Sequence, residues 1–285
     1  MAAKELIMLA LQVSIVATVF GFGLKTLRAD FQYLFERPGL LVRSLVSVFV
    51  VMPAVALLMA RLFDIRLAAE IAIVALAVSP VPPLLPQRES KLGGNQSYGL
   101  ALMAVLAMLA IVTVPLSAAV IEHVFGRQIS ASPSAIARVV LIATVFPLLA
   151  GMLVRARWPA AAERIEPAVM RGARILLVLA ALALLAGTWR AVLDAIGGGA
   201  LVAMIAFVVI GLAVGHVLGG PDPDQAVVLA LSTASRHPAI ALSIASASAP
   251  NEHFIGIILL FLFVNMIVGT AYLKWRWPSP APTTA

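Results

Sequence analysis

The chain has no cysteine in its 285 residues. Disulfide bonds, thiolate catalysis and metal sites built on cysteine are therefore excluded. The four histidines stand at positions 123, 216, 237 and 253, so none of them forms an HExxH-type motif for a metal ion. The sequence predicts neither a metal site nor a cofactor.

Charged residues are also few. Asp, Glu, Lys and Arg make up 12% of the chain, hydrophobic residues make up 62%, and the mean hydropathy is +1.05. A soluble domain carries about 25% charged residues, and apolar runs of about 20 residues are typical of helices that cross a bilayer. The composition therefore indicates an all-α polytopic membrane protein, surrounded by the lipid bilayer and without a separate soluble domain.

The charges that do occur are mainly basic, and the net charge is +7. In a soluble protein this excess would raise nucleic acid as a partner. In a membrane protein, lysine and arginine collect in the cytoplasmic loops. The excess therefore does not indicate binding to nucleic acid.

Nine apolar segments are long enough to be transmembrane spans. They cover residues 5–24, 39–60, 67–92, 97–121, 134–154, 173–190, 199–218, 224–249 and 252–274. The first segment is too long for the core of a signal peptide, so we interpret it as a span. With the N-terminus outside and the C-terminus in the cytoplasm, most lysines and arginines face the cytoplasm, including those of an expected loop at 155–174. We predict an integral multi-pass protein of a bacterial-type plasma (inner) membrane.

Two of the nine segments contain helix-breaking sequence. The segment 67–92 runs into PVPPLLPQRESK, and the segment 224–249 contains STASRHP at its middle. Proline removes a backbone donor and clashes with the preceding turn, so both helices are expected to break. Non-helical backbone at membrane depth is tolerated where protein buries it or where it lines a watery cavity. The breaks therefore indicate a binding site, although proline can also kink a helix for packing alone.

The two broken segments occupy corresponding places in the chain. Each is second from last in its half, and the two halves cross the membrane in opposite directions. This pattern predicts two inverted repeats, at 1–121 and 134–274, joined by an external linker at 122–133 and followed by a cytoplasmic tail at 275–285. Paired broken helices in inverted repeats mark the binding sites of secondary transporters.

Four features occur in an order and spacing that one known family shares. They are TVFGFGLKTLRADFQYLFERPG, VMPAVALLMARLFDIRLAAEIAIVAL, Pro80 with the pair Gly94 and Asn95, and DQAVVLALSTASRHPAIALSIASA. In these features the chain resembles the bile acid:sodium symporter family over nearly its whole length. The resemblance implies a first repeat that lacks its first helix, a panel domain from spans one, five and six, and a core domain in which the two broken helices cross.

The positions that bind sodium in that family carry different residues here. The resemblance aligns its ligands with Val48, Leu85, Pro86, Gly99, Met103, Arg236 and His237, and its glutamate with Ser232. Sodium prefers several hard oxygen ligands, and a carboxylate favours it further. The resemblance therefore implies that the usual sodium sites are lost.

Arg236 is the residue that most needs an explanation, because it lies in the middle of a span. A charge at the bilayer centre costs at least ~2.5–3.5 kcal/mol. We expect its partner to be Glu89 in the other broken segment, or a bound anionic substrate, or each in turn. His237 either carries a coupling proton or hydrogen-bonds a loop carbonyl. Further candidates for the site are Ser232, Thr233, Ser235, Gln87 and Asn95.

Together these features predict a secondary transporter that moves a small organic anion by alternating access. A proton gradient or exchange would drive it, and sodium would not. The alternative is a sodium-coupled organic-acid symporter with a non-standard ion site. We expect no enzyme activity, because no Asp or Glu stands beside His237 to orient it and Arg236 and Pro238 flank it.

Overall fold

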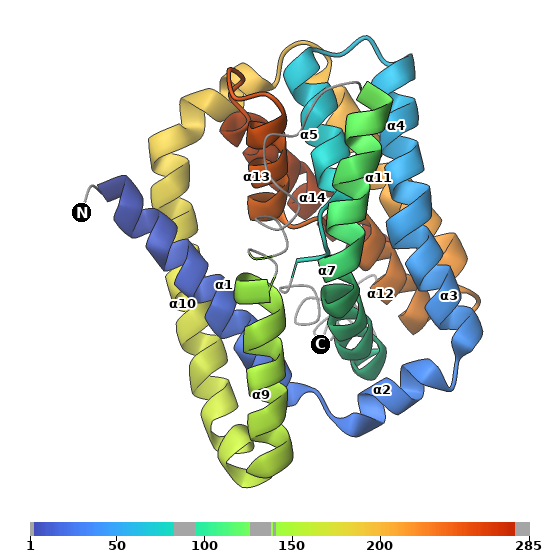
Figure 1. Cartoon of the computed structure of the whole chain (residues 1–285), viewed down its shortest axis with the longest axis vertical. Coiled ribbons are helices and arrows are strands. Elements are labelled where there is room, and N and C mark those ends of the chain that lie inside the picture. Colours follow the sequence, from blue (N-terminus) through green and yellow to red (C-terminus); the bar gives the residue numbers. More distant parts are fainter. Residues whose placement is uncertain (1–2, 83–94, 126–137, 139–140, 277–285) are drawn as a thin grey trace, which may run out of the picture.

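The computed structural model describes residues 3–82, 95–125, 138 and 141–276. This part of the chain is helical and contains no β-strand. Its first half consists of α1 (Ala3–Lys25), α2 (Arg28–Phe35), α3 (Pro38–Val46), the π-helical turn η1 (Ser47–Val51), α4 (Met52–Leu62), α5 (Leu67–Val78) and α7 (Gln96–Phe125). Its second half consists of the π-helical turn η2 (Leu141–Val145), α9 (Phe146–Arg157), α10 (Pro159–Ala195), α11 (Ala200–Gly219), α12 (Pro223–Ala234), α13 (Pro238–Ser248) and α14 (Ile255–Arg276) (Figure 1).

Within the described ranges, six helical units are long and apolar enough to cross a membrane. They are Glu5–Lys25, Pro38–Leu62, Pro159–Ala195, Ala200–Gly219, Pro223–Ser248 and Ile255–Arg276. Two shorter apolar helices cover Leu67–Val78 and Gln96–Ala110. This pattern fits the predicted all-α polytopic membrane protein, while the count of nine spans and the inverted repeats stay predictions.

The prediction of a loop at 155–174 is wrong. Helix α9 ends at Arg157 and α10 begins at Pro159, so a single residue, Trp158, forms the turn. Proline is favoured at the first position of a helix, and the Ala, Glu and Arg residues that follow are good helix formers. Polarity alone therefore did not end the helix, and α10 reaches 37 residues.

Helices α1, α9 and α10 pack against one another on one side of the molecule (Figure 1). We call them the α1/α9/α10 group. Where α1 crosses α9, a Cβ atom on Gly23 would lie 2.3 Å from the Leu148 carbonyl oxygen, and one on Gly151 would lie 2.2 Å from the Phe20 carbonyl oxygen. Small residues allow such close helix contacts in a bilayer, where van der Waals packing replaces the hydrophobic effect. Two ion pairs join the polar ends of this group, Lys25 to Glu166 at 3.2 Å and Arg155 to Glu163 at 3.0 Å.

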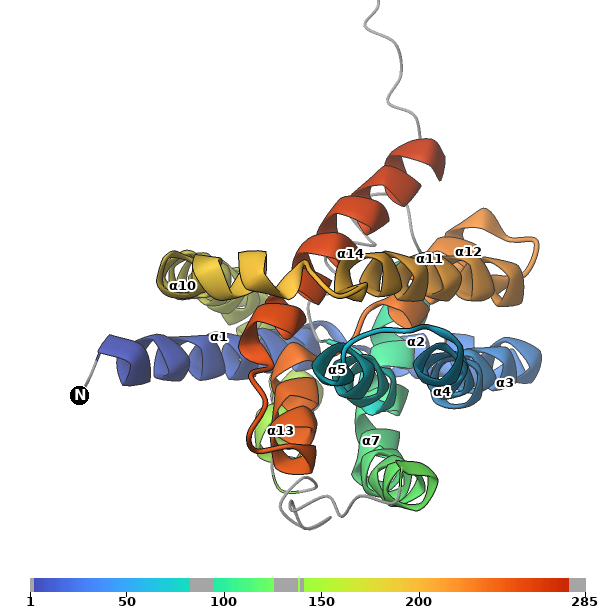
Figure 2. The same cartoon turned by 90° about the horizontal axis from the view of Figure 1, so that it is seen from above.

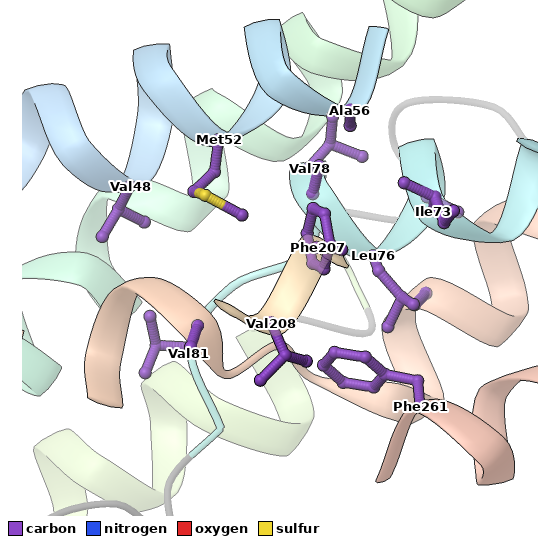
Figure 3. Close-up of a cluster of buried hydrophobic side chains, with 14 of the residues drawn as sticks. Val48, Met52, Ala56, Ile73, Leu76, Val78, Val81, Phe207, Val208 and Phe261 are labelled. Carbon is purple, nitrogen blue, oxygen red and sulfur yellow. The ribbon is translucent and has the colours of Figure 1, made fainter. Parts of the chain in front are cut away.

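The remaining helices form a second, larger body around α5, α11 and α12. A row of glycines on α11 packs against a row of alanines on α12, pairing Gly211 with Ala234, Gly215 with Ala230 and Gly219 with Ala226. Beside this contact lies a buried cluster that includes Val48, Met52, Ile73, Leu76, Phe207 and Phe261 (Figure 3). This packing holds the ends of α5 and α12 in fixed positions near the middle of the molecule.

Candidate functional site

The second broken segment is interrupted where the sequence predicted. Helix α12 ends at Ala234, and Ser235 has the extended conformation φ −94°, ψ 139°. His237 is also extended, and Pro238 starts α13. Proline disfavours a helical conformation in the residue before it and has no N–H to continue the ladder. The three residues 235–237 therefore form a short non-helical link between two half-helices.

The first broken segment meets this link directly. Helix α5 ends at Val78, and Ser79 is extended. The backbone N–H of His237 donates to the carbonyl oxygen of Pro80 at 2.8 Å. Helices α5 and α13 pack against each other beside this contact (Figure 2). Pro80 and His237 are 157 positions apart in the sequence. A backbone hydrogen bond between them joins the two breaks.

Arg236 is buried at this junction, with 1% of its surface exposed. Its Nη2 donates to the carbonyl oxygen of Val48 at 3.3 Å. The Val48 carbonyl would otherwise accept from the N–H of residue 52 or 53. The N–H of Met52 donates to the Ser47 carbonyl oxygen instead, in the π-helical turn, and Pro53 has no N–H, so the Val48 carbonyl is available. The Met-Pro sequence therefore presents a backbone acceptor to the guanidinium.

Arg236 and His237 have buried polar atoms without a hydrogen-bond partner in the part of the chain that the structure describes. Nε and Nη1 of Arg236 have no hydrogen-bond partner among the described residues, and neither do the two ring nitrogens of His237, which is 2% exposed. A buried polar group without a partner costs about 1–3 kcal/mol, and a charged group costs more. Such groups gather in functional sites, where a ligand completes their hydrogen bonds.

The hydroxyl groups around Arg236 have protein partners. The hydroxyl of Thr233 lies 2.6 Å from that of Ser47, which joins α12 to η1. Asn265 of α14 donates through Nδ2 to the Ala234 carbonyl oxygen at 3.0 Å and lies 3.3 Å from the Ser235 hydroxyl. Ser232 is buried in the same turn. These contacts fix the end of α12 and bring four predicted residues together with Arg236: Ser232, Thr233, Ser235 and His237.

Asn95 lies in another cluster. Its Oδ1 accepts the Tyr98 N–H at 2.9 Å and so caps the start of α7, while its Nδ2 donates to the Tyr33 hydroxyl at 3.0 Å. The Tyr33 hydroxyl also accepts from Nε2 of Gln225 at 2.9 Å. Among the described residues, no hydrogen bond connects Asn95 with the break at 235–237.

Two predicted site residues, Gln87 and Glu89, lie outside the described residues. The pairing of Arg236 with Glu89 therefore stays a prediction. Within the described part of the chain, no group of three His, Asp or Glu side chains is placed to hold a metal ion.

Sequence reasoning missed the partners of these residues. The Pro80 carbonyl carries no sequence signal, because any residue has a carbonyl oxygen. The free Val48 carbonyl has only an indirect signal, Pro53, whose missing N–H leaves a backbone acceptor unused. Ser44 and Ser47 could have been found, since a spacing of three places both hydroxyls on one face of a helix. The first lies 2.7 Å from the Tyr98 hydroxyl and the second binds Thr233.

A family model described as the Sodium Bile acid symporter family matches residues 12–195. The chain belongs to this family. The match confirms the predicted family and, with the apolar helices, supports a transport protein of the membrane. No individual curated protein matches the chain. The matched residues end where α10 ends, so the break at 235–237 lies beyond them.

Proposed function

We propose that the protein is a secondary transporter of a small organic anion that works by alternating access without sodium coupling. Its family consists of transporters, and the name of the family specifies sodium and bile acid. Substrate and coupling ion are proposed from the residues of this chain.

The observation that carries the proposal is the buried guanidinium of Arg236. Helix α12 ends just before it, and the bond from His237 to Pro80 places the end of α5 beside it. Each helix C-terminus carries roughly −0.5 elementary charge. Two such helix ends attract a cation, and in this chain the guanidinium of Arg236 supplies that positive charge. A sodium ion at the same place would be repelled by Arg236, and the side chain of Val48 offers it no ligand.

Nε and Nη1 of Arg236, which no described residue accepts from, favour an anion as the transported species. Helix α13 begins at the same link, and no side chain caps its first turn. Free N–H groups at a helix N-terminus and a guanidinium both bind carboxylates. Ala239, in this first turn, is exposed, which leaves the start of α13 accessible. We therefore assign Arg236 and His237 to the anion, with Ser232, Thr233 and Ser235 supporting the link.

We assign Glu89 the role of exchanging with the substrate as the partner of Arg236 during the transport cycle. In the empty carrier Glu89 pairs with Arg236, and a substrate anion or a proton on Glu89 releases the pair. His237 is the alternative proton carrier. Gln87 and Asn95 are assigned to the polar lining of the path.

The test is uptake by purified protein in liposomes, with pantoate and taurocholate as probe anions. Equal uptake in sodium and choline media, with stimulation by a proton gradient or by anion loaded inside, is expected. Strict dependence on sodium would overturn the loss of sodium coupling and favour the second candidate, a sodium-coupled organic-acid symporter with a non-standard ion site. Family membership is the observation in favour of that candidate.

A further inference from the structure

Three aromatic rings gather where α11 and α14 end. His216 lies in the last turn of α11, and Tyr272 and Trp275 lie near the end of α14. Nδ1 of His216 is 2.7 Å from the Tyr272 hydroxyl. The ring centroids of His216 and Tyr272 are 5.8 Å apart, and each of these two centroids is 6.1 Å from that of Trp275. We call these three residues the α11/α14 aromatic cluster.

The cluster borders an exposed apolar surface. Val217, which follows His216 directly, is 75% exposed, and Trp275 is 70% exposed. Helices α11 and α14 are both long and apolar enough to cross a membrane, and both end within a few residues of the cluster. Tyrosine and tryptophan are enriched at the level of the lipid headgroups, where their rings have an apolar and a polar side. A lipid is therefore the neighbour that this surface fits.

Arg276 adds a positive charge beside the cluster. It follows Tyr272 by four residues, so the two side chains share one face of α14. Its Nε is buried and has no hydrogen-bond partner in the described part of the chain. No described carboxylate forms an ion pair with it, and residues 277–285 contain no Asp or Glu. The guanidinium therefore has room for an anion that the described protein does not supply.

The acidic residues that follow α11 do not fill this role. Asp222 and Asp224 are the first carboxylates after His216. Oδ1 of Asp222 accepts two backbone N–H groups at the start of α12. Asp224 lies in the exposed first turn of α12. Neither is paired with Arg276 among the described residues.

His216 supplies a second donor. A neutral imidazole that accepts the Tyr272 O–H at Nδ1 carries its own proton on Nε2. No second hydrogen bond of His216 occurs among the described residues. The Nε2–H group of His216 and the guanidinium of Arg276 thus flank the same tyrosine with donors that no described residue uses.

We propose that the α11/α14 aromatic cluster, together with Arg276, binds the phosphate headgroup of an anionic phospholipid. The guanidinium donates to two phosphate oxygens, a geometry that suits arginine, and the His216 Nε2–H donates to a phosphate oxygen as well. Val217 and Trp275 contact the acyl chains. These exposed apolar side chains favour a lipid over a soluble phosphate. The inference is independent of Arg236 and of the transported anion.

Quenching of tryptophan fluorescence by a brominated lipid tests the proposal. The full chain is reconstituted with Trp158→Phe and Trp189→Phe, both at exposed positions, so that Trp275 and Trp277 report. Brominated phosphatidylglycerol and brominated phosphatidylcholine with the same acyl chains are compared. Phosphatidylglycerol should associate roughly ten-fold or more tightly, because hydrogen bonds to a charged group distinguish it. No transport substrate is needed, so this result does not depend on the proposed function.

Lys274 provides the matched control for Arg276. It is exposed and lies about 200° around α14 from Arg276, away from the cluster. Arg276→Gln should lower the association of phosphatidylglycerol roughly ten-fold or more. Lys274→Gln removes the same charge and should lower it by no more than about five-fold, the effect of one lysine near a charged surface. His216→Gln should lower it roughly two- to ten-fold.

Arg276→Lys separates a lost contact from a misfolded protein. It keeps the charge but not the two parallel donors, so its preference for phosphatidylglycerol should lie between those of the unmodified chain and of Arg276→Gln.

Three results would overturn the proposal. Equal association of the two brominated lipids would show that the cluster has no anionic lipid site. Equal losses in Arg276→Gln and Lys274→Gln would reduce the preference to diffuse surface charge. Displacement of brominated phosphatidylglycerol by millimolar inorganic phosphate would show that the site takes a soluble anion and no lipid.

Discussion

The α1/α9/α10 group and the junction of the broken helices use polar residues in opposite ways. In the most apolar window of α10 only 11% of the residues are buried, whereas in that of α12–α13 78% are buried. At one rim of the group four charges form partly exposed ion pairs, Lys25 with Glu166 and Arg155 with Glu163. The junction buries Arg236 without a carboxylate among the described residues.

The difference shows which charges need an explanation. A partly exposed ion pair contributes about 0–1 kcal/mol, since water screens it and its side chains lose freedom. A charge at membrane depth costs at least ~2.5–3.5 kcal/mol. Arg155 is accounted for by its partly exposed ion pair with Glu163, whereas the buried Arg236 is the charge for which we propose a function.

The largest effect is expected from replacing Arg236, the buried charge of the junction. We expect Arg236→Ala to weaken binding of the transported anion by roughly 30-fold or more, because truncating one side of a buried charge pair costs about 2 kcal/mol or more. Arg155→Ala removes an arginine of the α1/α9/α10 group and should leave the affinity unchanged. Isothermal titration in detergent, with the anion found in the uptake screen, measures both variants. Equal affinity of Arg236→Ala and the unmodified chain would make Arg236 a structural residue.

Two glycines, one in the larger body and one in the α1/α9/α10 group, differ in how closely their helices pack against neighbours. A Cβ atom on Gly215 would lie 2.4 Å from the Leu229 carbonyl oxygen, so Gly215→Ala forces α11 and α12 apart. The free energy of unfolding should fall by about 1–3 kcal/mol. Gly187 of α10 has nothing within 4 Å of that position, and Gly187→Ala should be neutral or stabilising by up to about 1 kcal/mol. Thermal unfolding in detergent compares them, and an equal loss in both variants would contradict the close contact of α11 with α12.

The smallest effect is expected at the rim of the group. Glu166→Gln removes the partner of Lys25 at 3.2 Å. The pair is partly exposed, so stability should fall by no more than about 1 kcal/mol, and the loss should shrink further in high salt. Glu163→Gln serves as the parallel variant for Arg155. A loss well above this range, independent of salt, would show that the rim holds α1 and α10 together more firmly than its exposure implies.

Much of the fold could be predicted from the sequence, because helix period, apolar length and proline position are local properties. The break at STASRHP was predicted from Pro238 and lies at residues 235–237. The loop at 155–174 was predicted wrongly, because charge was interpreted as the end of a helix although the residues there are good helix formers.

For the candidate site, the sequence could offer only its own polar residues. Arg236, His237, Ser232, Thr233 and Ser235 are candidates because polar side chains are rare within an apolar span, and their role in binding stays a prediction. Their partners were not identified, since the Val48 and Pro80 carbonyls belong to residues without a polar side chain. Asn95 caps α7 and contacts Tyr33, two contacts that the sequence did not indicate, and its place in the polar lining of the path stays a proposal.

By itself the sequence determined that this chain is a helical membrane protein of the Sodium Bile acid symporter family, with a charge at the break of a span. These properties depend on residues close together in the chain. Only the tertiary structure decided that the Arg236 guanidinium meets a carbonyl freed by Pro53, and that Arg66 and Tyr33 each hydrogen-bond a residue more than 60 positions away in the sequence. Backbone groups exist at every residue, so only the packing of helices selects which of them meet.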